Sequence, residues 1–341
     1  MNQPMPRPVI ALIHALADGA PHPRAALAHT LAATLGAECL PEALSARTLA
    51  EAAALGVRIE AAGETLSLAA PLDLLDVAGI GRLIPAAAQL SLRAIACHPE
   101  TDSTNERLLA LAAEGDLQGL VSLAEYQHAG RGRRGGRWIQ PYASGICLSL
   151  GWTFPEVPEA PVPLSLVVGV AVARALAGLG LAGVGLKWPN DIHHADAKLG
   201  GVLVEGRAAP GGRWQVVLGV GLNHRLPPAL PVLDQPITDL ARSLSPLPRR
   251  QEVAAALLGA MVTALEEWSL AGFAPFAVEW RGLDLLHGRE VLVQGEGQGE
   301  SRGRAAGVAA DGALLLAVAG EVGEVPQRIY AGHVRPLETG G

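Results

Sequence analysis

A segment dense in arginine and glycine, residues 130–138, restricts the folds open to this chain. Its sequence, GRGRRGGRW, follows a strand-like run and contains the pattern G-x-G-x-x-G. In a dinucleotide-binding turn that pattern opens a helix, and an acidic ribose ligand follows about twenty residues later. Here Pro141 breaks a helix, and only Glu156 lies near the expected position, in a proline-rich stretch. The segment therefore predicts an anion-binding loop outside a Rossmann fold, since arginine forks fit phosphate well.

The lysines mark a second candidate site. Of the 26 basic residues only Lys187 and Lys198 are lysine, and they lie eleven positions apart. Lysine is a compact point charge and arginine a planar fork, so the two are not interchangeable at a tuned site. The lysines open the segments KWPND (187–191) and KLGG (198–201). We therefore take residues 187–201 as the chemical centre of the protein.

Composition excludes several classes of protein. The net charge of −7 gives the whole chain no electrostatic preference for nucleic acid. The longest apolar run, residues 164–172, is interrupted by serine and glycine and is too short to span a membrane. The N-terminus lacks the charged region and cleavage site of a signal peptide. Three scattered cysteines, Cys39, Cys97 and Cys147, predict neither disulfides nor a zinc site. We expect a cytoplasmic protein with no membrane segment.

The N-terminal part, residues 1–70, has the pattern of a winged helix-turn-helix. Three short helices are expected there, the third opened by Pro41, and a hairpin with a turn at Gly63 follows them. The expected helices and strands are 8–18, 24–35 and 41–55, then 57–60 and 65–68. A small helical cap without a nucleic-acid role fits the same pattern.

The remainder predicts an α+β protein. Residues 71–96 are expected to be a linker and 97–283 a mixed-sheet domain, because its strand-like runs have few crossover helices between them. Its expected strands are 120–126, 146–152, 185–188, 200–205 and 214–220, with a helix opened at Ser103 and others at 163–179 and 251–270. Short strands separated by glycine turns predict a small SH3-like β-barrel over residues 284–341.

Five motifs, in order and spacing, carry a family resemblance. They are DSTN (102–105), EYQxAGRGRR (125–134), KWPND (187–191), KLxGxLxE (198–205) and GxGxN (219–223). Together they make residues 97–225 resemble biotin protein ligase. The flanking segments resemble the three-domain form of that family, which is both a ligase and a biotin-operon repressor.

The resemblance implies the reaction of a biotin–[acetyl-CoA carboxylase] ligase. Biotin and ATP, with Mg²⁺, give biotinyl-5′-adenylate and pyrophosphate. The activated carboxyl group then passes to one lysine of a biotin carboxyl carrier protein. Residues 130–138 would close over the adenylate, because an acyl-adenylate hydrolyses unless water is excluded.

The resemblance also implies the roles of individual residues. Lys198, Arg131 and Arg133 would be catalytic, and Lys198 would bridge the biotin carboxylate and the α-phosphate. Asp191 would hold Mg²⁺, although a turn residue is the other interpretation. The expected biotin-binding residues are Ser103, Thr104, Gln127, Gly130, Arg131, Gly132, Arg133, Lys198, Gly201 and Gly219. The expected ATP-binding residues are Arg133, Arg134, Trp138, Lys187, Asn190, Lys198 and Asn223.

Some of these residues also have a purely structural interpretation. Ser103 and Glu106 are spaced as a capping box for the helix that follows. Trp138 and Trp188 can serve packing as well as stacking. Arg134 can be a solvated residue.

Two alternative functions remain open, a lipoate or octanoate ligase and a biotin-responsive DNA-binding regulator. Charge counts against DNA as a partner, because residues 1–98 hold six arginines and eight acidic residues, a net charge of −2. Only Arg47 lies in the expected recognition helix, and phosphate contacts supply much of the affinity for DNA. A homodimer would supply a second half-site.

Overall fold

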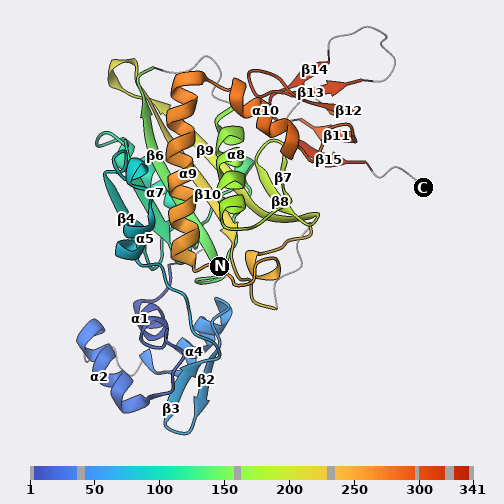
Figure 1. The fold of residues 1–341 in the computed structure, drawn as a ribbon. Coiled ribbons are helices and arrows are strands. Elements are labelled where there is room, and N and C mark those ends of the chain that lie inside the picture. Colours follow the sequence, from blue (N-terminus) through green and yellow to red (C-terminus); the bar gives the residue numbers. More distant parts are fainter. Residues whose placement is uncertain are drawn as a thin grey trace.

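The computed structural model describes residues 4–36, 43–156, 163–228, 235–295, 299–318 and 326–337. Three sheets follow one another along the chain, of three, seven and five strands (Figure 1). The N-terminal unit lies at one end of the large central sheet and the C-terminal strands lie near the other end. This arrangement confirms the α+β class.

The N-terminal unit has the expected three-helix and hairpin pattern. Ser45 accepts a hydrogen bond from the Thr48 N–H and thereby starts the last helix, so this helix begins at Ala46. The expected start at Pro41 and the residue Cys39 lie outside the described residues. The elements are α1 (Arg7–Ala15), β1 (His22–Pro23), α2 (Arg24–Leu35), α4 (Ala46–Ala54), β2 (Ile59–Ala62) and β3 (Thr65–Leu68).

The segment expected as a linker is structured and packs on the central unit. It contains α5 (Val77–Leu83), capped by Asp76, and α6 (Ala86–Gln89). Both helices pack against α9 (Arg250–Ala271). The first strand of the central sheet, β4 (Ala94–His98), also starts inside this segment.

The central sheet is mixed, and among its described strands only the first pair is parallel. In spatial order its strands are β4, β5 (Leu120–Ala124), β6 (Gly145–Phe154), β10 (Trp214–Asn223), β9 (Ala197–Ala208), β8 (Asp191–His194) and β7 (Val184–Lys187). Strand β8 was not predicted, because the turn before it and its pair of histidines gave no strand pattern.

The two faces of the central sheet are covered by different helices. Side chains alternate along β10, so Val216 and Leu218 join the large core while Val217 packs in a separate cluster with Leu108. The large core lies under α8 (Pro163–Gly178) and α9, and Leu108 belongs to α7 (Thr104–Ala112) on the opposite face. Glycines Gly219 and Gly221 share the α7 face with Val217, and the cavity described below opens there.

Helix α9 alone among the described helices is long and apolar enough to cross a membrane. In this structure 56% of the 18-residue apolar stretch of this helix is buried. It packs against α8 and the central sheet, which is the position of a core helix.

The C-terminal strands form an open sheet in the described residues. Helix α10 (Ala274–Leu283) leads into β11 (Glu290–Gln294), β12 (Glu300–Val308), β13 (Leu314–Ala317), β14 (Gln327–Ile329) and β15 (His333–Pro336), and their spatial order is β14-β13-β12-β11-β15. The edge strands β14 and β15 do not pair there, so closure of the predicted SH3-like barrel is not detected in the described strands. Closure depends on strand tilt and stagger, which a pattern of short strands and glycine turns does not specify.

Candidate active site

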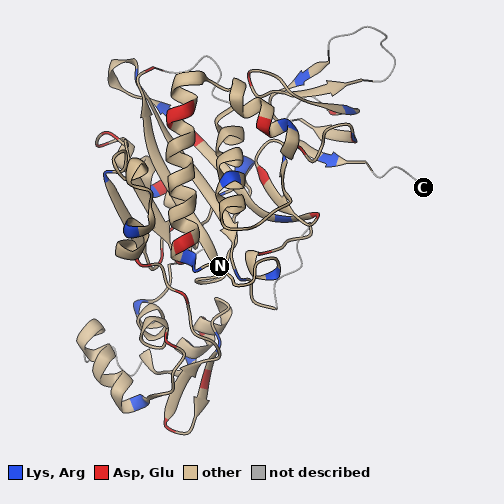
Figure 2. Ribbon diagram, in the orientation of Figure 1, with Lys and Arg blue, Asp and Glu red and all other residues tan. Residues whose placement is uncertain are grey.

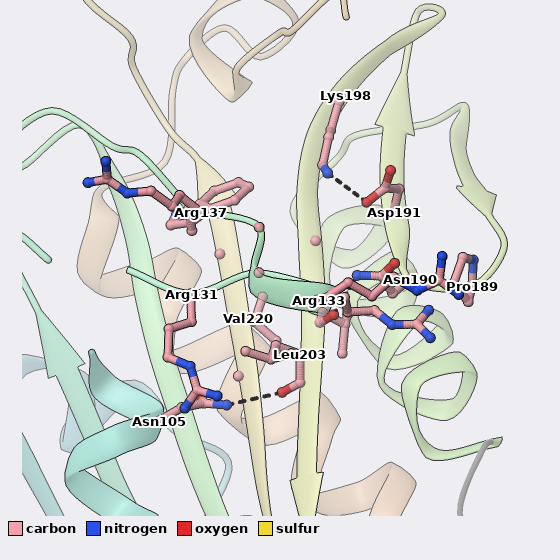
Figure 3. A pocket seen from close by; sticks show the side chains of 18 of the residues that line it. Asn105, Arg131, Arg133, Arg137, Pro189, Asn190, Asp191, Lys198, Leu203 and Val220 are labelled. Carbon is pink, nitrogen blue, oxygen red and sulfur yellow. Dashed lines mark hydrogen bonds and ion pairs between the residues drawn. The ribbon is translucent and has the colours of Figure 1, made fainter. Parts of the chain in front are cut away.

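A cavity of about 300 Å³ opens on the α7 face of the central sheet (Figure 3). Its floor is formed by β9 and β10, and its walls by the start of α7, the loop 130–138 and the turn between β7 and β8. Residues 332–334 of the C-terminal unit complete one side.

Glycines on β10 make room for the walls of the cavity. A Cβ atom at Gly221 would lie 2.4 Å from Trp138 Cε2, and one at Gly219 would lie 2.3 Å from Asn105 Oδ1. Only glycine therefore lets the loop tryptophan and the start of α7 lie directly over the strand. This is the physical reason for the two glycines of the motif GxGxN.

One end of the cavity, the amide end, is defined by Ser103, Thr104, Asn105 and Gln127. Gln127 Oε1 accepts hydrogen bonds from the Thr104 N–H (2.7 Å) and the Thr104 hydroxyl (3.1 Å). Ser149 Oγ lies 2.7 Å from Thr104 Oγ1 and donates to Asn105 Oδ1 at 2.6 Å. These uncharged polar groups form a fixed network suited to a neutral polar ligand.

The predicted capping box at the start of α7 is wrong. Ser103 occupies the N-cap position and is 2% exposed, but its hydroxyl makes no capping hydrogen bond. Glu106 pairs instead with Arg131. The ion pair with the loop thus replaces the hydrogen bond that Glu106 would make within the helix.

The other end, the lysine end, is defined by Lys187, Asn190, Asp191 and Lys198. Lys198 Nζ lies 2.7 Å from Asp191 Oδ1, and both side chains are largely buried. The Asn190 amide donates to the Val202 carbonyl at 2.7 Å and so holds the turn onto β9. Burial lowers the pKa of Lys187, with Lys198 adding to this effect and Asp191 opposing it.

The arginine-glycine loop is a closed hairpin above the two ends. At its base the Trp138 N–H donates to the Gly130 carbonyl at 3.0 Å, and Gly132 donates to Gly136 at 2.7 Å. Its tip is a short 3-10 turn in which Arg134 has φ 54° and ψ 42°. Burial lowers the pKa of Arg133, as does Arg134, while Asp191 opposes the change. Arg133 extends toward Asn190 in the close view (Figure 3).

The charges around the cavity favour a polyanion. Among the described residues, six basic side chains line it and Asp191 is the one carboxylate. The six are Arg133, Arg134, Arg137, Lys187 and Lys198, together with Arg131, whose charge is offset by ion pairs with Glu106 and Glu205. The described residues contain no group of three or more metal-ligating side chains, so Mg²⁺ would need ligand oxygens beside Asp191. That donor set fits Mg²⁺, which proteins usually hold by one or two carboxylates and substrate phosphates.

Comparison with known proteins agrees with this geometry. Residues 98–223 match the biotin/lipoate A/B protein ligase family, and residues 286–334 match the biotin protein ligase C-terminal domain. The bifunctional ligase/repressor BirA of Salmonella typhimurium is 37% identical over 257 residues, which cover 74% of this chain and 77% of that protein. The chain belongs to the biotin protein ligase family.

Two further relatives extend the comparison. The biotin–[acetyl-CoA-carboxylase] ligase of Mycobacterium tuberculosis is 38% identical over 226 residues, which cover 65% of this chain and 82% of that enzyme. A solved structure of the Aquifex aeolicus biotin protein ligase in complex with biotin and ATP is 25% identical, with a TM-score of 0.61 over 72% of this chain and all of that one.

Most residues expected to form the site in this biotin protein ligase family member line the one cavity. Gly130 and Asn223 do not. Gly130 lies at the base of the hairpin, and the buried Asn223 amide donates to the Thr238 carbonyl at 2.9 Å.

Sequence reasoning missed other residues of the cavity. Asn105 lay inside a quoted motif but had no assigned role, whereas Gln235 and His333 carried no local signal. Burial lowers the pKa of His333, with Lys187 adding to the effect.

Proposed function

We propose that this chain is a biotin protein ligase that attaches biotin to one lysine of a biotin carboxyl carrier protein. Biotin and ATP form biotinyl-5′-adenylate, and the carrier lysine then displaces AMP. The observation that carries the proposal is the cavity itself, in which the neutral amide and hydroxyl groups of the amide end face a strongly basic lysine end in a chain of this family.

The two ends divide the substrates between them. The polar groups of Ser103, Thr104 and Gln127 suit the neutral ureido ring of biotin, whose hydrogen-bonding groups need partners when buried. The basic end suits the phosphates of ATP. The biotin carboxylate then lies between the ends, where its oxygen attacks the α-phosphorus and pyrophosphate leaves.

Lys198 is placed to stabilise the charge that develops in this step. Its ammonium lies 2.7 Å from Asp191 in the structure, so the lysine must exchange that carboxylate for ligand oxygens. A compact ammonium can reach two oxygens of different groups, here the carboxylate and the α-phosphate. The same exchange frees Asp191 to hold Mg²⁺, which supplies further neutralisation of phosphate charge when bound.

The loop protects the product of this step. Trp138 and the hairpin tip line the cavity, and closure of the loop over the adenylate would exclude water, without which an acyl-adenylate hydrolyses. The amine of the carrier lysine attacks the carbonyl carbon of the adenylate, the bond to AMP breaks, and an amide forms. No covalent bond to the enzyme is needed.

Mass spectrometry of a carrier domain incubated with the chain, ATP, Mg²⁺ and biotin tests the proposal. We expect one biotinyl group on one lysine. Pyrophosphate release measured with biotin, lipoate and octanoate in parallel decides the substrate. Release with lipoate or octanoate but not with biotin would replace this proposal by the lipoate-type alternative.

We also propose that the N-terminal unit binds DNA only weakly, although relatives are named bifunctional ligase/repressors. Basic residues are sparse on this unit (Figure 2). Arg47, on α4, is exposed but its Nε lies 2.8 Å from Glu51 Oε1, which offsets its charge. A tight, salt-sensitive shift of DNA from the chain's own biotin operon, dependent on biotin and ATP, would contradict this proposal.

A further inference from the structure

Arg131 lies at the opposite end of the cavity from Lys198 (Figure 3). Its Nη2 is 2.7 Å from Glu205 Oε1, and its Nη1 pairs with Glu106. Figure 3 shows the guanidinium directed toward Asn105 and away from Lys198 and Asp191. Arg133, two residues further along the loop, extends instead toward Asn190 and Pro189.

The two carboxylates make Arg131 a poor ligand for phosphate. One guanidinium between two carboxylates leaves a net charge of −1 for the Arg131 triad, which we define as Arg131, Glu106 and Glu205. An anion that approached this guanidinium would meet both carboxylates at short range, and like charges repel. The triad therefore favours a neutral ligand beside it.

The triad and the hydrogen bonds of Asn105 together connect four elements at the amide end. Glu106 belongs to α7, Glu205 to β9 and Arg131 to the base of the hairpin. Glu205 Oε2 also accepts from the Asn105 amide at 2.9 Å, and Asn105 Oδ1 accepts from Ser149 on β6. The loop base is thus joined to the same network that positions Thr104 and Gln127.

The triad is partly exposed, so its strength depends on this network. The side chains of Arg131, Glu106 and Glu205 are 37%, 45% and 21% exposed. An isolated ion pair with such exposure contributes little to stability. A single fork that serves two carboxylates, one of which is fixed by Asn105, has a defined geometry and can hold the loop base in place.

Resting on the proposed function, we propose that Arg131 is a positioning residue for the biotin end and not a phosphate ligand. It fixes the first turn of the loop against α7 and β9, and leaves the phosphates to Arg133 and the residues of the lysine end. Loss of the triad loosens the hairpin base, so biotin binding weakens while ATP binding is largely kept.

Biotin-dependent exchange of pyrophosphate into ATP tests the proposal, with KM measured separately for biotin and ATP. We expect Arg131→Met to raise KM for biotin roughly tenfold or more, as for a lost hydrogen bond between charged groups, and to leave KM for ATP within about twofold. Arg133→Met, a matched change two residues away, should raise KM for ATP instead. An Arg131→Met enzyme with an unchanged KM for biotin and a raised KM for ATP would overturn the proposal.

A double-variant cycle separates positioning from a general loss of stability. If Arg131 acts through Glu205, Arg131→Met combined with Glu205→Gln should raise KM for biotin no more than the stronger single change does. Additive effects of the two changes would contradict this route.

Hydrogen–deuterium exchange over residues 130–138 measures how firmly the triad holds the loop, without relying on catalysis. Exchange at the hairpin base should rise in Arg131→Met and stay at the wild-type level in Arg133→Met. A wild-type chain without biotin-dependent exchange of pyrophosphate would contradict the proposed function. Hydrogen–deuterium exchange would still decide in that case whether Arg131 holds the loop base. Equal exchange in all three proteins would overturn the positioning role.

Discussion

At the scale of single residues, the choice of lysine over arginine is the strongest chemical signal in the chain. Lys198 stands in a chain where nearly every other cation is arginine, and it contacts Asp191 through a single short ion pair. We expect Lys198→Arg to lower biotin-dependent adenylation about a hundredfold or more, because a planar fork cannot replace a point charge between two ligand oxygens. Pyrophosphate release under saturating biotin and ATP measures this. Near-normal release would remove Lys198 from the chemical step.

Arg250, unlike Lys198, was not singled out by any pattern in the sequence. Arg250 is 1% exposed, pairs with Glu125 and donates to the Gly145 carbonyl at 2.9 Å. Loss of one partner of a buried ion pair costs about 3–5 kcal/mol, so Arg250→Met should lower the free energy of unfolding by about that amount.

Arg249 supplies the matched control for this prediction. Its side chain is 62% exposed and lies 3.4 Å from Asp73, so Arg249→Met should cost less than about 1 kcal/mol. Denaturant unfolding compares the two variants. An equal loss of unfolding free energy in both variants would mean that the buried ion pair of Arg250 stabilises the fold no more than the exposed Arg249 does.

At the scale of elements, the sequence located most helices and the long strands of the central sheet, because alternation and helical periodicity are local signals. It missed α5 and α6, whose apolar faces have meaning only against α9. It also predicted a barrel where the described strands form an open sheet, since closure is a property of the whole sheet.

The candidate site was predictable to a similar degree. The glycine, lysine and arginine motifs pointed to residues that line one cavity. The partner of each side chain was not predictable, because Arg131 meets Glu205 across 74 positions of the sequence. Long-range pairing depends on the order of strands in the sheet, which the sequence pattern did not provide.

The facing glycines of β9 and β10 allow a test of how the loop lies on the sheet. Gly221 and Gly201 are register partners, but an added Cβ would lie 2.4 Å from the Trp138 ring at Gly221 and 3.7 Å from its nearest neighbours at Gly201. We expect Gly221→Ala to displace Trp138 and raise proteolysis of the loop, and Gly201→Ala to leave loop proteolysis near the wild-type level. Equal cleavage of the loop in both variants would show that Trp138 does not rest on β10.

At the scale of the whole molecule, the N-terminal unit contacts the chain on both sides of the arginine-glycine loop. After the loop, the Tyr142 N–H donates to the Leu55 carbonyl at 3.0 Å. Before it, Glu100 accepts from the Met5 N–H at 2.8 Å and lies 2.7 Å from His128 Nδ1. The unit is therefore not a separate cap, and its removal should alter the position or mobility of the arginine-glycine loop.

Two truncations distinguish this coupling from folding. Removal of residues 1–70 frees both flanks of the loop, so we expect a raised KM for biotin in a protein that still folds. Removal of residues 1–90 also deletes α5, α6 and Asp73, whose carbonyl accepts from the buried Arg250 at 2.9 Å, and should leave little folded protein. Circular dichroism measures whether each truncated protein folds, and biotin-dependent exchange of pyrophosphate into ATP measures its KM for biotin. An unchanged KM after removal of residues 1–70 would show that the loop does not depend on the N-terminal unit.

The same interface contains a histidine whose protonation should weaken it. His14 Nε2 lies 2.7 Å from the hydroxyl of the buried Tyr142, and burial lowers the pKa of His14, with Glu125 opposing the change. An exposed histidine takes up a proton near pH 6.5, so the undocked state binds more protons than the docked state below that pH. Stability of the docked state is therefore complete above about pH 6.5 and falls as the pH decreases toward the lowered pKa.

We expect acidification from about pH 7.5 to 5.5 to undock the N-terminal unit before the central unit unfolds. Protease cleavage between β3 and α5 measures the undocking. Other histidines with lowered pKa, among them His98 and His224, add a general acid sensitivity. His14→Gln isolates the interface, because glutamine can still bond to the Tyr142 hydroxyl and does not titrate. Cleavage that rises equally in wild type and His14→Gln would assign the pH response to another group.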